Sequence, residues 1–130
     1  MEIPTNTKVI EWSTSVMWWD ESGILCSISK KAPMQTMEEA KKALEDFRNL
    51  IGNRKVCLLI DVTDTSESNK ELRDYAAAEF PKFIKAMAMV SKSVLGKMLA
   101  NLFFSVKVQP YPAKMFNNET EAKEWLKQYL

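Results

Sequence analysis

The sequence predicts an α/β fold with a mostly parallel sheet, and two patterns point to it. Residues 56–62 (Val-Cys-Leu-Leu-Ile-Asp-Val) are apolar at six of seven positions without alternation, so this strand must be covered on both faces. From residue 36 onward, helical and strand patterns alternate, which predicts parallel strands joined by right-handed crossovers. The expected order is β-β-α-β-α-β-α-β-α, in a single domain over residues 1–130.

The first elements predict an antiparallel meander. Residues 8–12 form a first strand pattern, and residues 16–19 and 24–29 flank a turn at residues 20–23. The aspartate and glycine of that turn allow the backbone to reverse tightly.

Capping patterns predict where the helices begin. Thr36 and Glu39 fit a capping box for a helix that ends at Gly52, and Ser68 and Glu71 fit a second box for a helix to residue 79. After a strand at residues 85–90, Ser93 caps a third helix. A short strand at residues 113–116 precedes the last helix, which starts at residues 118–121.

Composition excludes several functional classes. The 130 residues carry a net charge of +1 without a basic stripe, which argues against nucleic-acid binding. No apolar run approaches the roughly 20 residues of an integral membrane span, and the first residues do not resemble a signal peptide, so we expect a cytoplasmic protein.

Few residues are suited to catalysis or metal binding. Histidine is absent, which removes Ser-His and Cys-His nucleophile pairs and His-ligated metal sites. Cys26 and Cys57 fall inside apolar strands and are expected to be buried hydrophobes. We therefore expect a non-enzymatic protein with no catalytic residue, no cofactor and no bound metal.

The order and length of the elements resemble the STAS domains (sulfate transporters and anti-sigma-factor antagonists) and the SpoIIAA-like superfamily around them. The resemblance covers nearly the whole chain. It is strongest at residues 56–62, the loop at residues 63–67, the helix from Ser68, and the ending at residues 115–126, which looks like that of small bacterial STAS-like proteins of unknown function. It implies a strand-helix superhelix that binds a protein partner.

The resemblance also implies a regulatory loop. In antagonists of this family, a serine at the start of the helix after the central strand is phosphorylated, and the matching residues here are Thr65, Ser66 and Ser68. The glycine of the family motif is absent after Asp64. The alternative is structural: Ser68 caps the helix while the other two hydroxyls bond locally.

Two carboxylates lie at the carboxyl end of the central strand. Asp61 and Asp64 could hold magnesium together with a phosphate, although no glycine-rich phosphate loop accompanies them. The alternative is that these carboxylates accept hydrogen bonds from loop amides.

Two apolar groups could form a second site. The side chains of Trp18 and Trp19 must point to opposite faces of a strand, so either both are core or one is left for a partner or a ligand. The third helix carries a wide apolar stripe that includes Met98, Leu102, Phe103 and Phe104. That stripe is core, an apolar ligand pocket as in the CRAL-TRIO-type lipid carriers that this fold also resembles, or a contact with a second subunit.

The resulting hypothesis is a regulatory or protein-interaction domain that acts through Asp61 and residues 64–68 on a protein partner or as a homodimer. The alternative is a carrier or sensor of a small apolar or lipid-like molecule.

Overall fold

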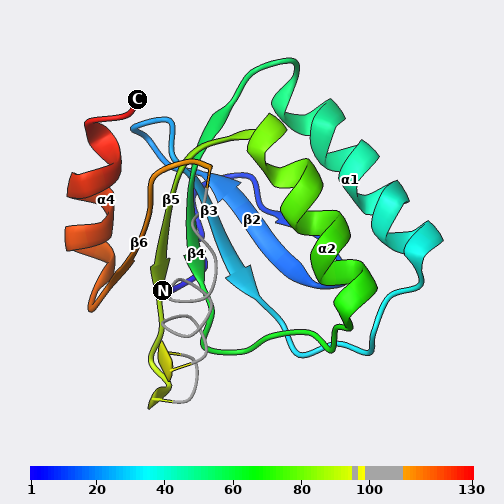
Figure 1. The fold of residues 1–130 in the computed structure, drawn as a ribbon. Helices are drawn as coiled ribbons and strands as arrows, with labels where there is room; N and C mark the ends of the chain where they lie inside the picture. Colours follow the sequence, from blue (N-terminus) through cyan, green and yellow to red (C-terminus); the bar gives the residue numbers. More distant parts are fainter. Residues whose placement is uncertain (95–96, 99–109) are drawn as a thin grey trace.

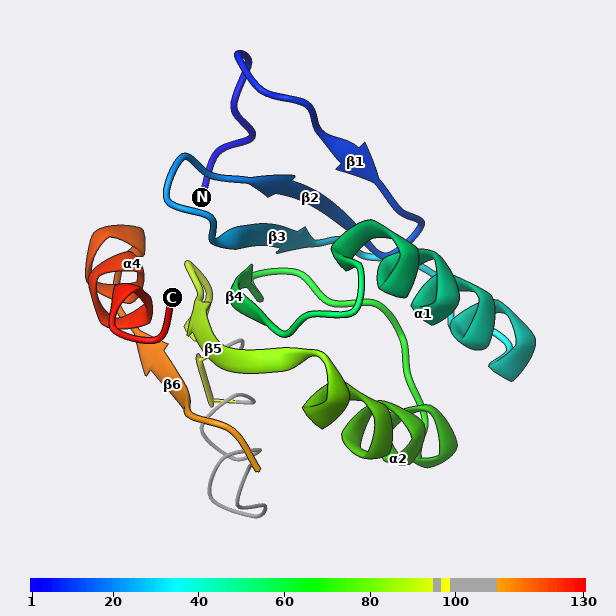
Figure 2. The same ribbon diagram turned by 90° about the horizontal axis from the view of Figure 1, so that it is seen from above.

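A computed structural model describes residues 1–94, 97–98 and 110–130, and it shows a six-stranded sheet with helices on both faces (Figure 1, Figure 2). The strands are β1 (Ile10–Glu11), β2 (Ser15–Trp19), β3 (Leu25–Ser29), β4 (Val56–Asp61), β5 (Ile84–Val90) and β6 (Ala113–Phe116). The helices within the described residues are α1 (Met37–Ile51), α2 (Lys70–Glu79) and α4 (Glu119–Lys127), and a 3₁₀ turn at Phe80–Lys82 follows α2.

The sheet confirms the predicted class. Its strands lie in sequence order, with β1, β2 and β3 antiparallel and β3, β4, β5 and β6 parallel. All three strand patterns predicted before α1, at residues 8–12, 16–19 and 24–29, form strands, so the element order begins with three strands and not with the two written in the expected order. The first of them, β1, is shorter than predicted: it is a two-residue edge strand that pairs Ile10 with Met17.

The central strand β4 is covered on both faces, as its composition predicted. Leu58 is 4% exposed and Leu59 is fully buried, and they belong to separate core clusters on opposite faces of the sheet. This burial confirms the prediction that the apolar strand at residues 56–62 is covered on both faces of the sheet.

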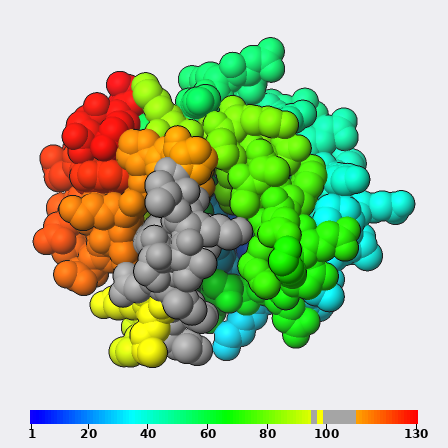
Figure 3. All heavy atoms as spheres, viewed as in Figure 1, coloured from blue at the N-terminus to red at the C-terminus, as the bar shows by residue number. Residues whose placement is uncertain are grey.

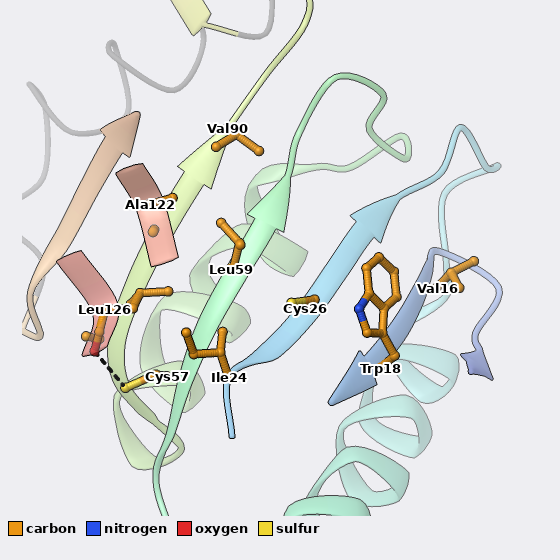
Figure 4. Close-up of a cluster of buried hydrophobic side chains, with 11 residues drawn as sticks. Val16, Trp18, Ile24, Cys26, Cys57, Leu59, Val90, Ala122 and Leu126 are labelled. Atoms are coloured by element: carbon orange, nitrogen blue, oxygen red, sulfur yellow. Dashed lines mark hydrogen bonds between the residues drawn. The ribbon is translucent and has the colours of Figure 1, made fainter. Parts of the chain in front are cut away.

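The face beneath α4 is closely packed (Figure 4). Ala86 and Ala88 of β5 and Ala122 of α4 are fully buried, and these small side chains allow helix and sheet to approach closely. The Sγ of Cys57 lies 3.9 Å from the carbonyl oxygen of Leu126. The other large members of this cluster are Val16, Trp18, Ile24, Leu59 and Val90.

The opposite face, beneath α1 and α2, is packed only in part. Leu25, Val56, Phe83 and Ile84 are buried at the end of the sheet where β4 begins. Ile51 is the one buried residue of α1, and α2 has none. The two helices therefore bury less of their surface than their apolar stripes predicted.

The caps confirm the predicted start of two helices and correct a third. Thr36 forms the full capping box with Glu39, and Asn118 accepts a hydrogen bond from the Glu121 backbone. The cap of α2 is Asn69, whose side chain accepts from the Leu72 backbone, so the capping box predicted at Ser68 was wrong. An asparagine caps as well as a serine, and here the extended backbone lies one residue later.

The predicted third helix falls mostly outside the described residues. Residues 94, 97 and 98 are helical, and the Lys97 backbone donates to the Ser93 carbonyl at 3.1 Å, as expected for a helix that begins at Ser93. Leu102, Phe103 and Phe104 lie outside the description.

Candidate functional site

A cavity of about 830 Å³ lies between α1, α2 and the sheet, and we call it the α1–α2 cavity. Both helices lie on the same side of the sheet (Figure 2), and their atoms form the green and cyan part of the surface in Figure 3. The opposite face has the close packing described above, so, among the described residues, the two faces of the sheet differ in how completely α1, α2 and α4 cover them.

The floor of the α1–α2 cavity changes in polarity along the strands. At one end it is formed by Leu58 and Ile84, and the partner of Leu58 on β3 is Leu25. Two residues further along β3, Ser27 lies between Met17 and Ile60.

The floor ends in a pair of hydroxyls, because Ser29 is paired with Ser15. From Leu25 to Ser29 is four residues, or about 13 Å of strand. The cavity therefore has an apolar end and a hydroxyl-bearing end.

Small side chains on both walls explain why the helices leave a space. Ala40, Ala43 and Ala76 line the helical wall of the same cavity whose floor carries the serines. Leu44, Phe47 and Phe80 close the apolar end of the cavity. The cavity thus follows from residue size at particular helix and strand positions.

The hydroxyl-bearing end contains polar groups without partners. Ser15 and Ser27 are 8% and 2% exposed, and within the described ranges no hydrogen bond joins the side chains of Ser15, Ser27 or Ser29 to another group. The indole Nε1–H of Trp12, which also lines the cavity, is buried and has no acceptor in the part of the chain described. An unpaired buried donor costs about 1–3 kcal/mol, so this end favours a ligand that offers an acceptor.

Hydrogen bonds fasten the loops around this end. The Ser66 hydroxyl donates to the Lys30 carbonyl at 3.0 Å, and the Glu67 backbone donates to the Ala32 carbonyl. The Lys30 backbone in turn donates to the Thr14 carbonyl. The predicted regulatory loop thus borders the cavity, and Thr65, Ser66 and Ser68 are among its lining residues.

Asp61 lies on the opposite side of the sheet from the cavity. It is 3% exposed, and it accepts hydrogen bonds from the Met1 amine at 2.8 Å and from the backbone and hydroxyl of Thr63. Burial favours the neutral carboxyl, but these donors together outweigh burial and lower its pKa below the ordinary 3.8. The carboxylate therefore holds the Met1 amine and Thr63 at the end of β4, which is a structural role.

The predicted pair of carboxylates does not form a shared site. Asp64 is exposed and lies 3.8 Å from Lys31, whereas Asp61 is buried against Met1. The described residues contain no group of three or more acidic or cysteine side chains that could hold a metal ion. Thr63 was missed by the sequence reasoning: its hydroxyl donates to Asp61 and accepts from the Lys92 backbone.

The two tryptophans point to opposite faces, as strand geometry predicted. Trp18 is 4% exposed in the cluster beneath α4. Trp19 is half-buried on the other face, and the Arg54 guanidinium lies 5.2 Å from its ring centre. Both cysteines are buried, as predicted.

The stripe predicted for an apolar pocket can be compared only at Met98. This residue is 62% exposed and does not line the α1–α2 cavity. The pocket residues that sequence reasoning missed lie on β2, β3 and α1. The available signal was the alternation of Ser27 and Ser29 with Cys26 and Ile28, which places hydroxyls on one face of an inner strand.

No helix within the described ranges has the length and apolar character needed to cross a membrane. None of the proteins of curated function matches the chain.

Among solved structures, the chain is similar to an uncharacterised protein of the DUF3478 family with a SpoIIAA-like fold from Shewanella loihica PV-4. The identity is 14% and the TM-score 0.61, over 97% of this chain and 99% of the other. A protein of unknown function from Arthrobacter sp. FB24 shares 23% identity over 85% of this chain and 90% of its own, with a TM-score of 0.28.

The Shewanella structure confirms the SpoIIAA-like fold that the sequence predicted. A family model matches residues 17–130, and the chain therefore belongs to the family described as "Domain of unknown function (DUF7793)".

Proposed function

We propose that the protein binds a small amphiphilic molecule, with one apolar tail and one polar end, in the α1–α2 cavity. The observation that carries the proposal is a space of about 830 Å³ whose floor changes from Leu58 and Ile84 to Ser15 and Ser29. Ligand pockets typically measure ~300–1,000 Å³ and combine mostly apolar walls with a few polar groups that fix orientation. This is the carrier or sensor function that the resemblance to CRAL-TRIO-type proteins suggested.

Binding without catalysis is the simplest use of these groups. The cavity hydroxyls belong to serines, and the chain has no histidine that could activate one as a nucleophile. The proposed role of the hydroxyls is to orient the polar end of the ligand.

The test is binding of the uncharged fluorescent probe N-phenylnaphthylamine, followed by its displacement with single-tailed amphiphiles. Ala76→Leu adds bulk to the helical wall of the cavity and is expected to weaken probe binding about tenfold. Ala77→Leu is the matched control, since Ala77 lies next in α2 but is exposed and does not line the cavity. Equal binding by both variants, or no binding by the unaltered protein, refutes the proposal.

A second candidate is regulated binding of a protein partner or of a second copy of the chain at residues 64–68. The observation that favours it is the hydrogen bond from the Ser66 hydroxyl to the Lys30 carbonyl. Phosphorylation would replace that donor with acceptors and release the loop. Thr65 and Ser68, its neighbours in the sequence, are exposed.

Ser66→Asp and Ser66→Ala test this candidate. We expect the two variants to differ in oligomeric mass by light scattering or in the affinity for an isolated partner. If mass and partner affinity are the same for both variants and the unaltered protein, phosphorylation of Ser66 does not control association.

A further inference from the structure

The charged residues that line the α1–α2 cavity are mostly acidic, and the two lysines beside its hydroxyl-bearing end, Lys30 and Lys31, pair with Glu11 and Asp64. Five charged residues line the cavity, and Lys42, the one cation among them, pairs with Asp46. Glu39 is engaged by the Thr36 backbone in the capping box. Glu38 and Glu67 remain, exposed and without an ion-pair partner in the described part of the chain.

The two helix starts at this end supply no net attraction for an anion. Thr36 and Asn69 already accept from backbone N–H groups in the first turns of α1 and α2. Glu38 and Glu71 place negative charge in the same turns. These carboxylates offset the positive ends of the helix dipoles and would repel a second anion.

The Trp12 indole restricts the chemistry of the ligand's head group further, because it disfavours a cation. Its buried N–H can only donate, so it requires an acceptor atom. An ammonium head has donors and no acceptor, whereas a hydroxyl or ester carbonyl can accept from Trp12 and also bond the hydroxyls of Ser15 and Ser29.

From this arrangement we infer that the ligand is an uncharged amphiphile whose polar end is a hydroxyl or an ester carbonyl, as in a monoacylglycerol or a fatty alcohol. The inference rests on the proposed function and specifies its ligand class. Free fatty acids are excluded from this ligand class, because Glu38 and Glu67 repel a carboxylate head group.

Three ligands with the same tail test it: monolaurin, laurate and dodecylamine, each below its micelle concentration at neutral pH. Displacement of N-phenylnaphthylamine should give an affinity for monolaurin at least about tenfold above the affinities for laurate and dodecylamine. Trp12→Phe should weaken monolaurin binding about fivefold, the loss of one hydrogen bond, and leave dodecylamine unchanged.

A charge-removing pair of variants isolates the role of Glu38 and Glu67. Glu38→Gln with Glu67→Gln should raise laurate affinity severalfold and leave monolaurin affinity unchanged. The matched control is Glu21→Gln with Glu45→Gln, since these exposed residues do not line the cavity and lie outside the first turns of α1 and α2.

The outcomes separate this inference from the proposed function. If the probe binds but laurate matches or exceeds monolaurin, or if the Glu38 and Glu67 substitutions change laurate affinity no more than the control pair, the head-group inference is refuted and the binding function stands. If neither the probe nor any of the three ligands binds, both are refuted.

Discussion

Enlarging Ala43 should stabilise the fold, because this α1 residue lines the α1–α2 cavity. Ala43→Leu adds three carbon atoms, and each buried CH₂ contributes about 0.8 kcal/mol, which sets an upper bound of about 2.4 kcal/mol. Lost leucine rotamer freedom costs about 0.5–1 kcal/mol, and the helix propensity of leucine is only slightly below that of alanine. We therefore expect the free energy of unfolding to rise by about 1 kcal/mol.

Ala88→Leu supplies the matched comparison. Ala88 is fully buried on the closely packed face beneath α4, where additional carbon atoms force neighbours apart and cost about 1–3 kcal/mol. Urea denaturation of the unaltered protein and the two variants measures both changes in the free energy of unfolding. The comparison requires that the dependence of this free energy on urea concentration is the same for all three proteins. If Ala43→Leu lowers stability as much as Ala88→Leu does, the space beneath α1 is filled and the argument for a ligand cavity fails.

Three further predictions concern the rest of the structure. The pKa of Asp61 is lowered, so its carboxylate stabilises the fold at pH values above the ordinary pKa of 3.8, and this contribution is lost as the pH falls through the folded-state pKa. Asp61→Asn should therefore flatten the acid side of a plot of unfolding free energy against pH. A plot with the same acid side as that of the unaltered protein would contradict this. Burial raises the pKa of Cys26 to about 12 and also raises the pKa of Cys57, so both thiols should react with a disulfide reagent only as fast as the protein opens, and rapid labelling of the native protein would show this to be wrong. Asn69→Ala should cost about 1 kcal/mol in urea denaturation and Ser68→Ala close to nothing, whereas the reverse order would restore Ser68 as the cap of α2.

Local features of the chain were predictable because neighbouring residues determine them. The unbroken apolar run required β4 to be an inner strand, and Thr36 and Asn118 start their helices through contacts within four residues. The choice between Ser68 and Asn69 was not predictable, since both side chains cap well and the local backbone conformation decides between them.

The candidate site depended on contacts between distant segments. Ser15 and Ser29 become neighbours only when β2 and β3 pair antiparallel, and Ala40 and Ala43 of α1 line the same cavity only when the helix lies over those strands. Asp61 similarly finds its charged partner in Met1, 60 residues away in the sequence. No periodicity in a single segment contains this information.

By itself, then, the sequence determined the class of fold, the inner position of β4 and most of the helix starts, because burial pattern and capping act over a few residues. Only the tertiary structure decided that one face of the sheet is filled and the other holds a cavity. The physical reason is that empty space depends on the combined size of side chains from β2, β3, α1 and α2, and only folding brings those side chains together.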